Sequence, residues 1–338
     1  MANKYIILGN GFSIDLVKKM KKENQLDLNN LFAKGEYVLY PKTQQKGFLS
    51  RKHTPNLWTL GARTYMEYEL ALQLITDVIT CANVFNLSME KRPGETKENN
   101  SVYIHAYSEL TSYLRYLFVY YNSLISDDDL KKILDDIEII NYVKKRSEKN
   151  RIYIVTYNYD ILLERLLKIA GINYDIFGFT NTGADVVIFK PHGSISFSFK
   201  IKVSESSPYY IRDVIVDAVS QNASDFEITY ELADDYPIVN AIIPPAGDST
   251  RFSFAWIKEI RKGIDEIVKE STSNDEMVLF GLSYWHVDRN EIDEILLSMD
   301  SSMEVKYVDP KPPTSFDAVL SSLFKNYIHY SSGKLLKE

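Results

Sequence analysis

The stretch YIILGNGFS at residues 5–13 decides the fold class. Residues 5–8 form a short apolar run of the kind that predicts a buried strand, and the run ends abruptly in Gly9-Asn10-Gly11. Ser13 or Asp15 can then cap a helix that reaches the lysines beyond. The stretch therefore predicts a strand, a tight turn and a helix in immediate succession.

The same order of elements recurs along the chain. Residues 151–156 (RIYIVT) predict a second strand, and the helical pattern after residue 160 is ended by Gly171. Short apolar strands separated by helical stretches predict an α/β fold, with a mostly parallel, Rossmann-like sheet covered by helices on both faces. Further strands are expected at residues 185–189, 238–243, 277–282 and 304–308.

A large insertion is expected between the first two strands. They are separated by roughly 140 residues, far more than an ordinary crossover needs, and the pattern there is helical. We therefore expect residues 41–146 to form a mainly helical subdomain, inserted into a Rossmann-type domain made of residues 1–40 and 147–338. One apolar seam within it predicts either core packing or a subunit interface. Its members are Tyr103, Tyr107, Leu110, Leu114, Leu117 and Tyr121.

Charge and composition exclude several classes of function. The chain has 39 Lys and Arg against 46 Asp and Glu, a net charge of −7, so it has no overall attraction for a nucleic-acid backbone. The single cysteine, Cys81, excludes an intrachain disulfide and a zinc site of several thiolates. The histidines lack the HExxH spacing, so we expect no metal. Trp285 replaces the second glycine of a GxSxG elbow, which disfavours a serine hydrolase.

The N-terminal apolar run is too short for a signal peptide, and no segment approaches the roughly 18 apolar residues of a membrane span. We therefore expect a cytoplasmic protein.

The unusual residues of the chain follow the predicted strands. In parallel α/β sheets, ligands bind beyond the carboxyl ends of the strands. We therefore expect these residues to meet in one crevice, although they are scattered in sequence. They are Gly9, Asn158, His192, Pro244, Ser283 and Asp309.

The glycine turn at residues 9–11 has two interpretations. Glycines after a strand let backbone N–H groups approach a pyrophosphate at the start of the following helix. The alternative is a tight turn that only the fold requires. Ile14 replaces the third glycine of the dinucleotide fingerprint, so the turn alone does not decide between them.

Three polar side chains are candidates for catalysis. His192, between Pro191 and Gly193, can exchange a proton near neutral pH and act as a general base, or it can be a loop histidine held for structural reasons. The Asn158 amide can hold a ribose hydroxyl or orient a water molecule. Asp160 is either part of this site or the N-cap of the next helix.

Taken together and in order, these motifs resemble the sirtuin-like NAD-binding family. The large helical insertion is similar to the bacterial branch associated with anti-phage defence. The AbiH-type abortive-infection family, whose glycine turn also begins GNGF, is a related alternative. The single cysteine cannot supply the four-cysteine zinc module of the deacylases, so peptide deacylation is not expected. The matching segments are GNGFS (9–13), TYNYD (156–160), PHGS (191–194), GLSYWHVD (281–288) and YVDP (307–310).

The resemblance implies an NAD+ glycohydrolase that releases nicotinamide and ADP-ribose and depletes NAD+ in abortive infection. It implies catalytic roles for Asn158, His192 and Asp160, and a homo-oligomer, with a partner ATPase or other defence protein as a further expectation. The alternative is a catalytically quiet NAD or ADP-ribose sensor, or a scaffold for a partner ATPase or nuclease. The residues expected to bind NAD+ are Gly9, Asn10, Gly11, Phe12, Ser13, Thr156, Gly281, Ser283 and Asp309.

Overall fold

The structure is a computed structural model and describes residues 2–91, 102–212, 221–244, 254–282, 284 and 289–337. The chain forms two compact units. The first, called the sheet unit below, comprises Met1–Glu23, Ile125–Pro191 and Ile257–Glu338. The second, called the insert unit, comprises Asn24–Leu124 and His192–Trp256. These bounds differ from the expected 41–146, because a second stretch of chain belongs to the insert unit and residues 125–146 belong to the sheet unit.

A seven-stranded parallel sheet forms the core of the sheet unit, in the order β10-β9-β8-β1-β2-β4-β3. This confirms the predicted α/β, Rossmann-like fold. The register pairs Leu8 with both Thr156 and Phe280, so the three central strands end level with one another. The strands are β1 (Lys4–Leu8), β2 (Ile152–Thr156), β3 (Tyr174–Ile176), β4 (Val186–Phe189), β8 (Glu276–Phe280), β9 (Glu304–Val308) and β10 (Asn326–Tyr330).

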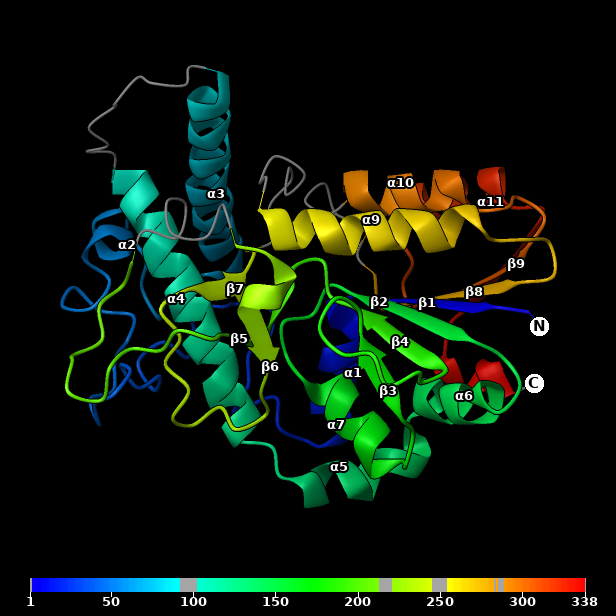
Figure 1. Cartoon of the computed structure of the whole chain (residues 1–338), viewed down its shortest axis with the longest axis horizontal. Coiled ribbons are helices and arrows are strands. Elements are labelled where there is room, and N and C mark those ends of the chain that lie inside the picture. Colours follow the sequence, from blue (N-terminus) through cyan, green and yellow to red (C-terminus); the bar gives the residue numbers. More distant parts are fainter. Residues whose placement is uncertain are drawn as a thin grey trace. The chain divides into compact units, whose positions relative to one another are not determined.

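Helices cover both faces of this sheet (Figure 1). The sheet lies between them, and every residue of β1 is buried, which explains why its sequence is a nearly continuous apolar run. One face carries α1 (Asn10–Lys19), α6 (Glu138–Ser147) and α7 (Leu162–Ile169), and the other carries α9 (Ala255–Lys269), α10 (Arg289–Ser298) and α11 (Thr314–Leu323). The short helices α5 (Asp127–Ile133), η1 (Leu134–Asp136) and η4 (Gly333–Lys337) complete the unit.

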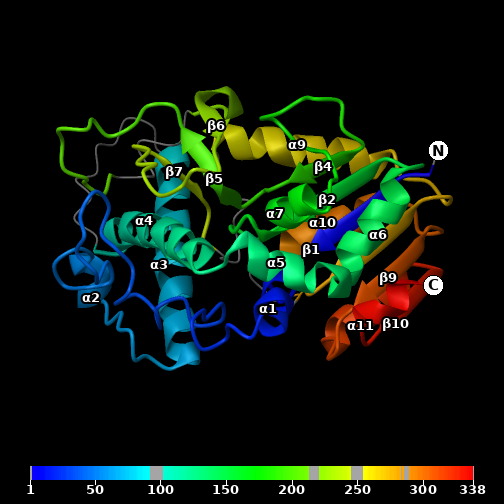
Figure 2. The same cartoon turned by 90° about the horizontal axis from the view of Figure 1, so that it is seen from below.

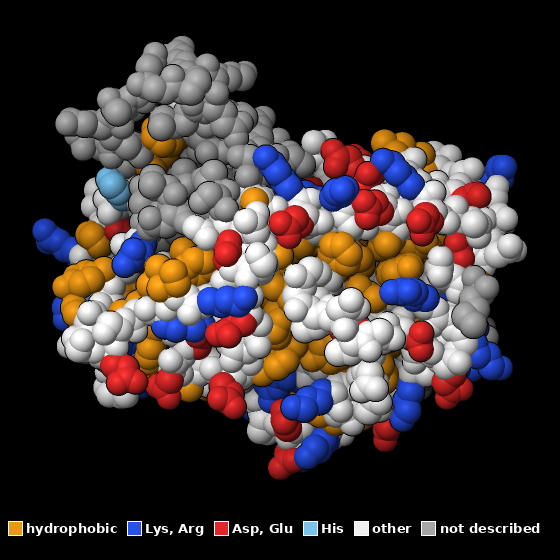
Figure 3. All heavy atoms as spheres, in the orientation of Figure 1, with side chains coloured by type: hydrophobic (Ala, Val, Ile, Leu, Met, Phe, Trp, Pro, Cys, Tyr) orange, Lys and Arg blue, Asp and Glu red, His pale blue; other side chains and the backbone are white. Residues whose placement is uncertain are grey.

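The exposed side of α9 carries charges of both signs, visible as blue and red side chains in Figure 3. Its opposite side is buried against the sheet unit, with Ile257, Ile260, Ile264 and Val268 all 5% exposed or less. The helix is therefore amphipathic in the usual sense for a helix that covers a sheet.

The order of the strands places a topological switch point between β1 and β8. From β1 the chain continues to β2 on one side, whereas β8, β9 and β10 follow one another on the other side. In open α/β sheets the crevice at such a point, beyond the carboxyl ends of the strands, is where ligands bind. The loops after Leu8 and Phe280 lie at this position.

The insert unit contains helices and a small antiparallel sheet in the order β6-β5-β7. Helix α4 contacts α2, α3 and β7, and Figure 2 shows α3 and α4 crossing. Its elements are α2 (Pro55–Thr59), α3 (Tyr68–Lys91), α4 (Val102–Ser123), η2 (Ala223–Asp225), β5 (Gly193–Phe199), β6 (Phe226–Ile228) and β7 (Asn240–Ile242).

Two expectations need correction here. The strand predicted at 238–243 is β7, which pairs antiparallel with β5 and is therefore not part of the parallel sheet. Pro244 follows β7 and belongs to the insert unit. The apolar seam of α4 packs inside the chain, since Tyr107, Leu110, Leu114, Leu117 and Tyr121 are each 2% exposed or less. Its interpretation as a subunit interface is wrong, and its interpretation as core is confirmed.

Within the described residues, no helix combines the length and the apolarity that a membrane crossing needs.

Candidate functional site

A cluster of three buried polar side chains lies where β1 and β2 end. The Asn158 side-chain nitrogen Nδ2 donates to the Gly9 carbonyl oxygen at 3.1 Å and to Ser13 Oγ at 3.0 Å. Ser13 Oγ in turn donates to Asp160 Oδ2 at 2.6 Å. We call Ser13, Asn158 and Asp160 the amide cluster. The structure thus brings together four of the residues predicted for the site, from segments about 150 positions apart in the sequence.

The amide cluster fixes the orientation of Asn158. Because both hydrogens of its Nδ2 are donated within the protein, the amide cannot be turned over without losing two hydrogen bonds. Among the described residues none donates a hydrogen bond to the amide oxygen, Oδ1. This oxygen is therefore available to accept a hydrogen bond from a hydroxyl group or a water molecule.

The segment after β2 is shaped by its own side chains. Thr156 Oγ1 accepts the Asn158 backbone N–H at 3.3 Å, and Asp160 Oδ1 accepts the Leu162 N–H at 3.0 Å, where α7 begins. The N-cap position of α7 is Ile161, so the prediction of Asp160 as the N-cap is wrong by one residue, although its carboxylate reaches the first turn. Its part in a catalytic site stays a prediction. One carboxylate oxygen satisfies the start of the helix, and the other holds Ser13.

A buried ion pair that the sequence analysis did not single out adjoins the amide cluster. Lys190 Nζ donates to the Asp160 carbonyl oxygen at 2.6 Å and to Glu164 Oε1 at 2.7 Å, and both charged side chains are fully buried. Burial raises the pKa of Glu164 above its usual range, and the Lys190 ammonium opposes part of that rise. A signal was present in the sequence, because Lys190 directly follows an apolar strand and Glu164 lies among buried leucines of α7.

The glycine turn packs directly against the loop after β8. Gly9 N–H donates to the Phe280 carbonyl oxygen at 3.1 Å, and Gly11 N–H donates to that of Gly281 at 3.0 Å. A Cβ atom at Gly9 would lie 2.5 Å from Gly281 O, and one at Gly11 would lie 2.6 Å from Gly281 Cα. Gly281 itself has φ +63°. Gly9 and Gly11 are therefore required by this close approach of two backbone segments. The predicted tight turn is not formed, because Gly9 is the N-cap of α1 with φ −103° and Asn10 and Gly11 already lie in the helix.

The same turn begins α1, with Gly9 as N-cap and Asn10 as the exposed first helical residue. Phe12 N–H donates to the Gly9 carbonyl oxygen at 3.1 Å, so the amides of Gly11 and Phe12 are both used inside the protein. The partial positive charge of the helix N-terminus remains beside the switch point. Phosphate binding at this turn stays a prediction.

Asp309 directly follows β9, next to the loop at residues 281–282. Tyr307 hydroxyl contacts both the Leu282 carbonyl oxygen, at 2.9 Å, and Asp309 Oδ2, at 3.3 Å. Asp309 Oδ1 accepts the Lys311 N–H at 2.7 Å, so its carboxylate also shapes its own turn. Ser283, predicted for the ribose loop, lies outside the described residues, as does His286.

His192 is the first residue of the second stretch of the insert unit. It is 1% exposed, its carbonyl oxygen accepts the Ile243 N–H at 2.9 Å, and Gly193 after it has φ +82°. Asn158 and Asp160 belong to the sheet unit. The convergence of His192 and Asn158 on one crevice therefore stays a prediction.

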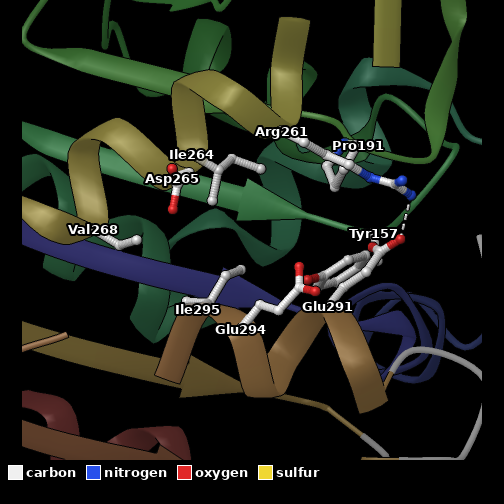
Figure 4. A pocket seen from close by; sticks show the side chains of 9 residues that line it. All are labelled: Tyr157, Pro191, Arg261, Ile264, Asp265, Val268, Glu291, Glu294 and Ile295. Atoms are coloured by element: carbon white, nitrogen blue, oxygen red, sulfur yellow. Dashed lines mark hydrogen bonds and ion pairs between the residues drawn. The ribbon is translucent and has the colours of Figure 1, made fainter. Parts of the chain in front are cut away.

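A hollow with a cavity volume of about 60 Å³, partly open to solvent, lies between α9 and α10 (Figure 4). An ion pair between Arg261 and Glu291 borders it. Its lining has three carboxylates against one guanidinium, so it is unsuited to a diphosphate. None of the three residues of the amide cluster lines this hollow, although Tyr157, next to Asn158 in the chain, does. Its lining is Tyr157, Pro191, Arg261, Ile264, Asp265, Val268, Glu291, Glu294 and Ile295.

Comparison with known proteins adds no further assignment, because no family model and no curated protein matches the chain. The described part of the chain also contains no group of three or more His, Cys, Asp or Glu side chains arranged to hold a metal ion.

Proposed function

We propose that the protein is an NAD+ glycohydrolase, which hydrolyses the bond between nicotinamide and ribose. The observation that carries this proposal is the amide cluster, buried beyond the carboxyl ends of β1 and β2 and next to the switch point of a parallel sheet. Its amide oxygen is oriented and lacks a donor from the described residues. Such a group suits a ribose hydroxyl or an attacking water.

For this reaction the protein must mainly position the reacting groups and stabilise the charge that develops on the ribose. Nicotinamide leaves with the electron pair of the C–N bond, as a neutral molecule, and water forms the new C–O bond to the ribose. The water loses one proton, which a base accepts. The transition state resembles an oxocarbenium ion, so the protein must chiefly position the water and stabilise positive charge.

Each predicted residue has a place in this scheme. Asn158 would hold the water or a ribose hydroxyl, with Ser13 and Asp160 keeping the amide in place, and His192 would accept the proton. The turn at residues 9–13 would face the diphosphate through the helix N-terminus. Thr156, Gly281, Ser283 and Asp309 would line the rest of the NAD+ site.

A second candidate is an NAD or ADP-ribose sensor without turnover. It is favoured by one observation, namely that the amide cluster is complete within the sheet unit without a histidine. Such a cluster can bind a ribose without supplying a base. In either case the biological role that we propose is anti-phage defence, with NAD+ depletion for the enzyme and assembly with a partner ATPase or nuclease for the sensor.

Incubation of the purified protein with NAD+, with released nicotinamide followed by chromatography, separates the two candidates. We expect turnover in the wild type and its loss in Asn158→Ala and in His192→Ala. Asn326→Ala and His105→Ala, at exposed positions, are the matched controls and should keep full activity. Tight NAD+ binding without turnover would favour the sensor, and turnover that survives both site substitutions would contradict the site assignment.

A further inference from the structure

The Lys190–Glu164 ion pair has no part in the scheme above, yet it adjoins the amide cluster. Lys190 follows the last residue of β4, and Glu164 lies in the first turn of α7. Both side chains are fully buried, and their charged atoms are 2.7 Å apart. All of these residues belong to the sheet unit.

Stability alone does not explain this pair. Removing two charges from water is costly, and apolar residues of similar volume often serve at least as well. The cost is higher here because Glu164 Oε2 is buried and has no hydrogen-bond partner among the described residues. The neighbouring buried positions of α7 are leucines, so an apolar side chain at residue 164 would fit the helix pattern. Packing alone therefore leaves the pair unexplained.

The contact of Lys190 with the backbone of Asp160 explains the pair better. Lys190 Nζ also donates to the Asp160 carbonyl oxygen at 2.6 Å. The carboxylate of the same residue accepts from Ser13 Oγ and from the Leu162 N–H. Asp160 is thus held through its backbone and through both carboxylate oxygens, and through Ser13 it fixes the Asn158 amide.

We propose that Lys190 is a positioning residue for the reaction, and that Glu164 holds its ammonium group in place. The pair keeps the segment at residues 157–162 in the conformation that aims the Asn158 amide oxygen. This inference rests on the proposed NAD+ hydrolysis for its effect on turnover, but not for its effect on the segment itself.

The test uses the double variant Lys190→Met/Glu164→Leu, which replaces the pair by apolar side chains and leaves no buried charge alone. If the pair only contributed stability, a folded double variant would regain wild-type behaviour. If Lys190 positions Asp160, the double variant folds but its segment at 157–162 exchanges amide hydrogens faster than in the wild type. Its kcat then falls by roughly 10- to 100-fold, as for a displaced catalytic group, with a smaller change in KM.

Lys4→Met/Glu276→Leu is the matched control. It removes another buried pair of the same sheet, 2.8 Å apart, at the other end of the strands, where β1 and β8 begin. Glu276 also pairs with Lys306, whose ammonium group keeps Glu304 as a partner in this variant. Exchange at 157–162 and kcat should stay as in the wild type. Glu164→Gln is a second probe that does not depend on the double variant. It retains an acceptor for Lys190, so we expect slow exchange at 157–162 and kcat within about threefold of the wild type.

The outcomes separate this inference from the proposed function. Wild-type protein that releases no nicotinamide contradicts the hydrolase, and the exchange measurement still decides whether Lys190 holds the segment. Wild-type exchange at 157–162 in the double variant overturns the inference. So does a wild-type kcat in that variant when the wild type is active. A Glu164→Gln variant as impaired as the double variant would overturn the role given to Glu164, because an amide acceptor would then not be enough to hold the ammonium group.

Discussion

Ser13 links the two other members of the amide cluster, since it accepts from Asn158 and donates to Asp160. Replacing it by alanine leaves Asp160 Oδ2 and one Asn158 hydrogen without this partner in a buried place. We expect Ser13→Ala to lower the free energy of unfolding by about 1–3 kcal/mol and to reduce nicotinamide release. Urea unfolding and the chromatographic assay measure both effects, with the exposed Ser301→Ala as control. An unchanged rate of release would mean that Ser13 does not orient the amide.

Gly281 and Gly171 differ in their surroundings although both have positive φ, at +63° and +72°. A Cβ atom added at Gly281 would lie 2.6 Å from the Phe12 nitrogen. A Cβ atom added at Gly171 would have no described atom within 4 Å beyond its chain neighbours. Gly171→Ala should therefore cost only the conformational penalty of about 1–2 kcal/mol. Gly281→Ala should cost clearly more, because two backbone segments must move apart. Equal midpoints of urea unfolding would contradict the close approach of these loops.

At the scale of single residues, the sequence was informative where a polar side chain directly follows a strand. Asn158 and Asp160 were found in this way, and the glycine motif led to Ser13. Glu164 was missed because a charged residue in a helix usually faces solvent. Its place among the leucines of α7 was the signal that could have found it, and the tertiary packing shows that its side chain is directed inward to meet Lys190. The sequence placed Gly9 and Gly11 after the first strand. It could not show that a side chain at either position would collide with Gly281, because that contact joins segments far apart in the sequence.

Strand β3 is tied to the loop that follows it by one carboxylate. Asp175 accepts the backbone N–H groups of Thr182, Gly183 and Ala184, as well as the Thr180 hydroxyl. Burial would raise the pKa of Asp175, but these hydrogen bonds outweigh it and the pKa is lowered. A lowered pKa in the folded state means that the charged form stabilises the fold.

The lowered pKa of Asp175 makes its contribution to stability depend on pH. The stabilisation by Asp175 is present above the unfolded-state pKa of about 4 and is lost as the pH falls through the lower folded-state pKa. We therefore expect Asp175→Asn to be less stable than the wild type in urea at pH 7, with the difference shrinking below about pH 4. Asp128→Asn, at an exposed side chain of the same unit, is the control. A stability difference that does not change with pH would count against this role of Asp175.

Helix α4 is the central helix of the insert unit rather than an outer surface. Leu114 is completely buried, so we expect Leu114→Ala to lower the free energy of unfolding by about 2–5 kcal/mol through the cavity it leaves. Leu297→Ala, at a residue that is 70% exposed, should have little effect. Thermal or urea denaturation measures both. A Leu114→Ala variant that kept its stability but changed its state of association would restore the interface interpretation.

At the scale of elements, the sequence predicted the strands that are long, apolar and buried on both sides. The strand at 238–243 has the same appearance, and nothing local reveals that it pairs with β5 in a different sheet. Strands β3, β5, β6 and β10 were not predicted. β5 (GSISFSF) alternates serine with apolar residues, so it shows no apolar run although it is buried. β3 has only three residues, and the residues of β10 are exposed or only half-buried at an edge of the sheet, so neither shows an apolar run.

For the whole molecule, the sequence indicated an insertion but only part of its extent. The long gap after the first strand predicted an insertion at residues 41–146, whereas the first stretch of the insert unit is Asn24–Leu124. The second stretch, His192–Trp256, follows a strand of the parallel sheet and gives no compositional signal of a change of unit. Which segments share a core is decided by long-range packing, which local patterns do not contain.

The prediction that the protein forms a homo-oligomer concerns the whole molecule. The α4 seam no longer supports it, because those side chains pack within the chain. Multi-angle light scattering at micromolar concentration is the direct measurement. We expect a mass of two or more times that of the 39.0 kDa chain. A mass equal to one chain would contradict the prediction.

The division of the chain into five alternating segments has a consequence for its synthesis on the ribosome. Strand β1 is made first, but its neighbour β8 begins only at Glu276, and Gly281 comes after that. A nascent chain that stops earlier has one unpaired edge on its central strand and no second loop against the glycine turn. A truncated translation product would therefore lack the complete switch point between β1 and β8. Under the proposed NAD+ hydrolysis, we expect such incomplete copies not to consume NAD+ in the cell that makes the protein.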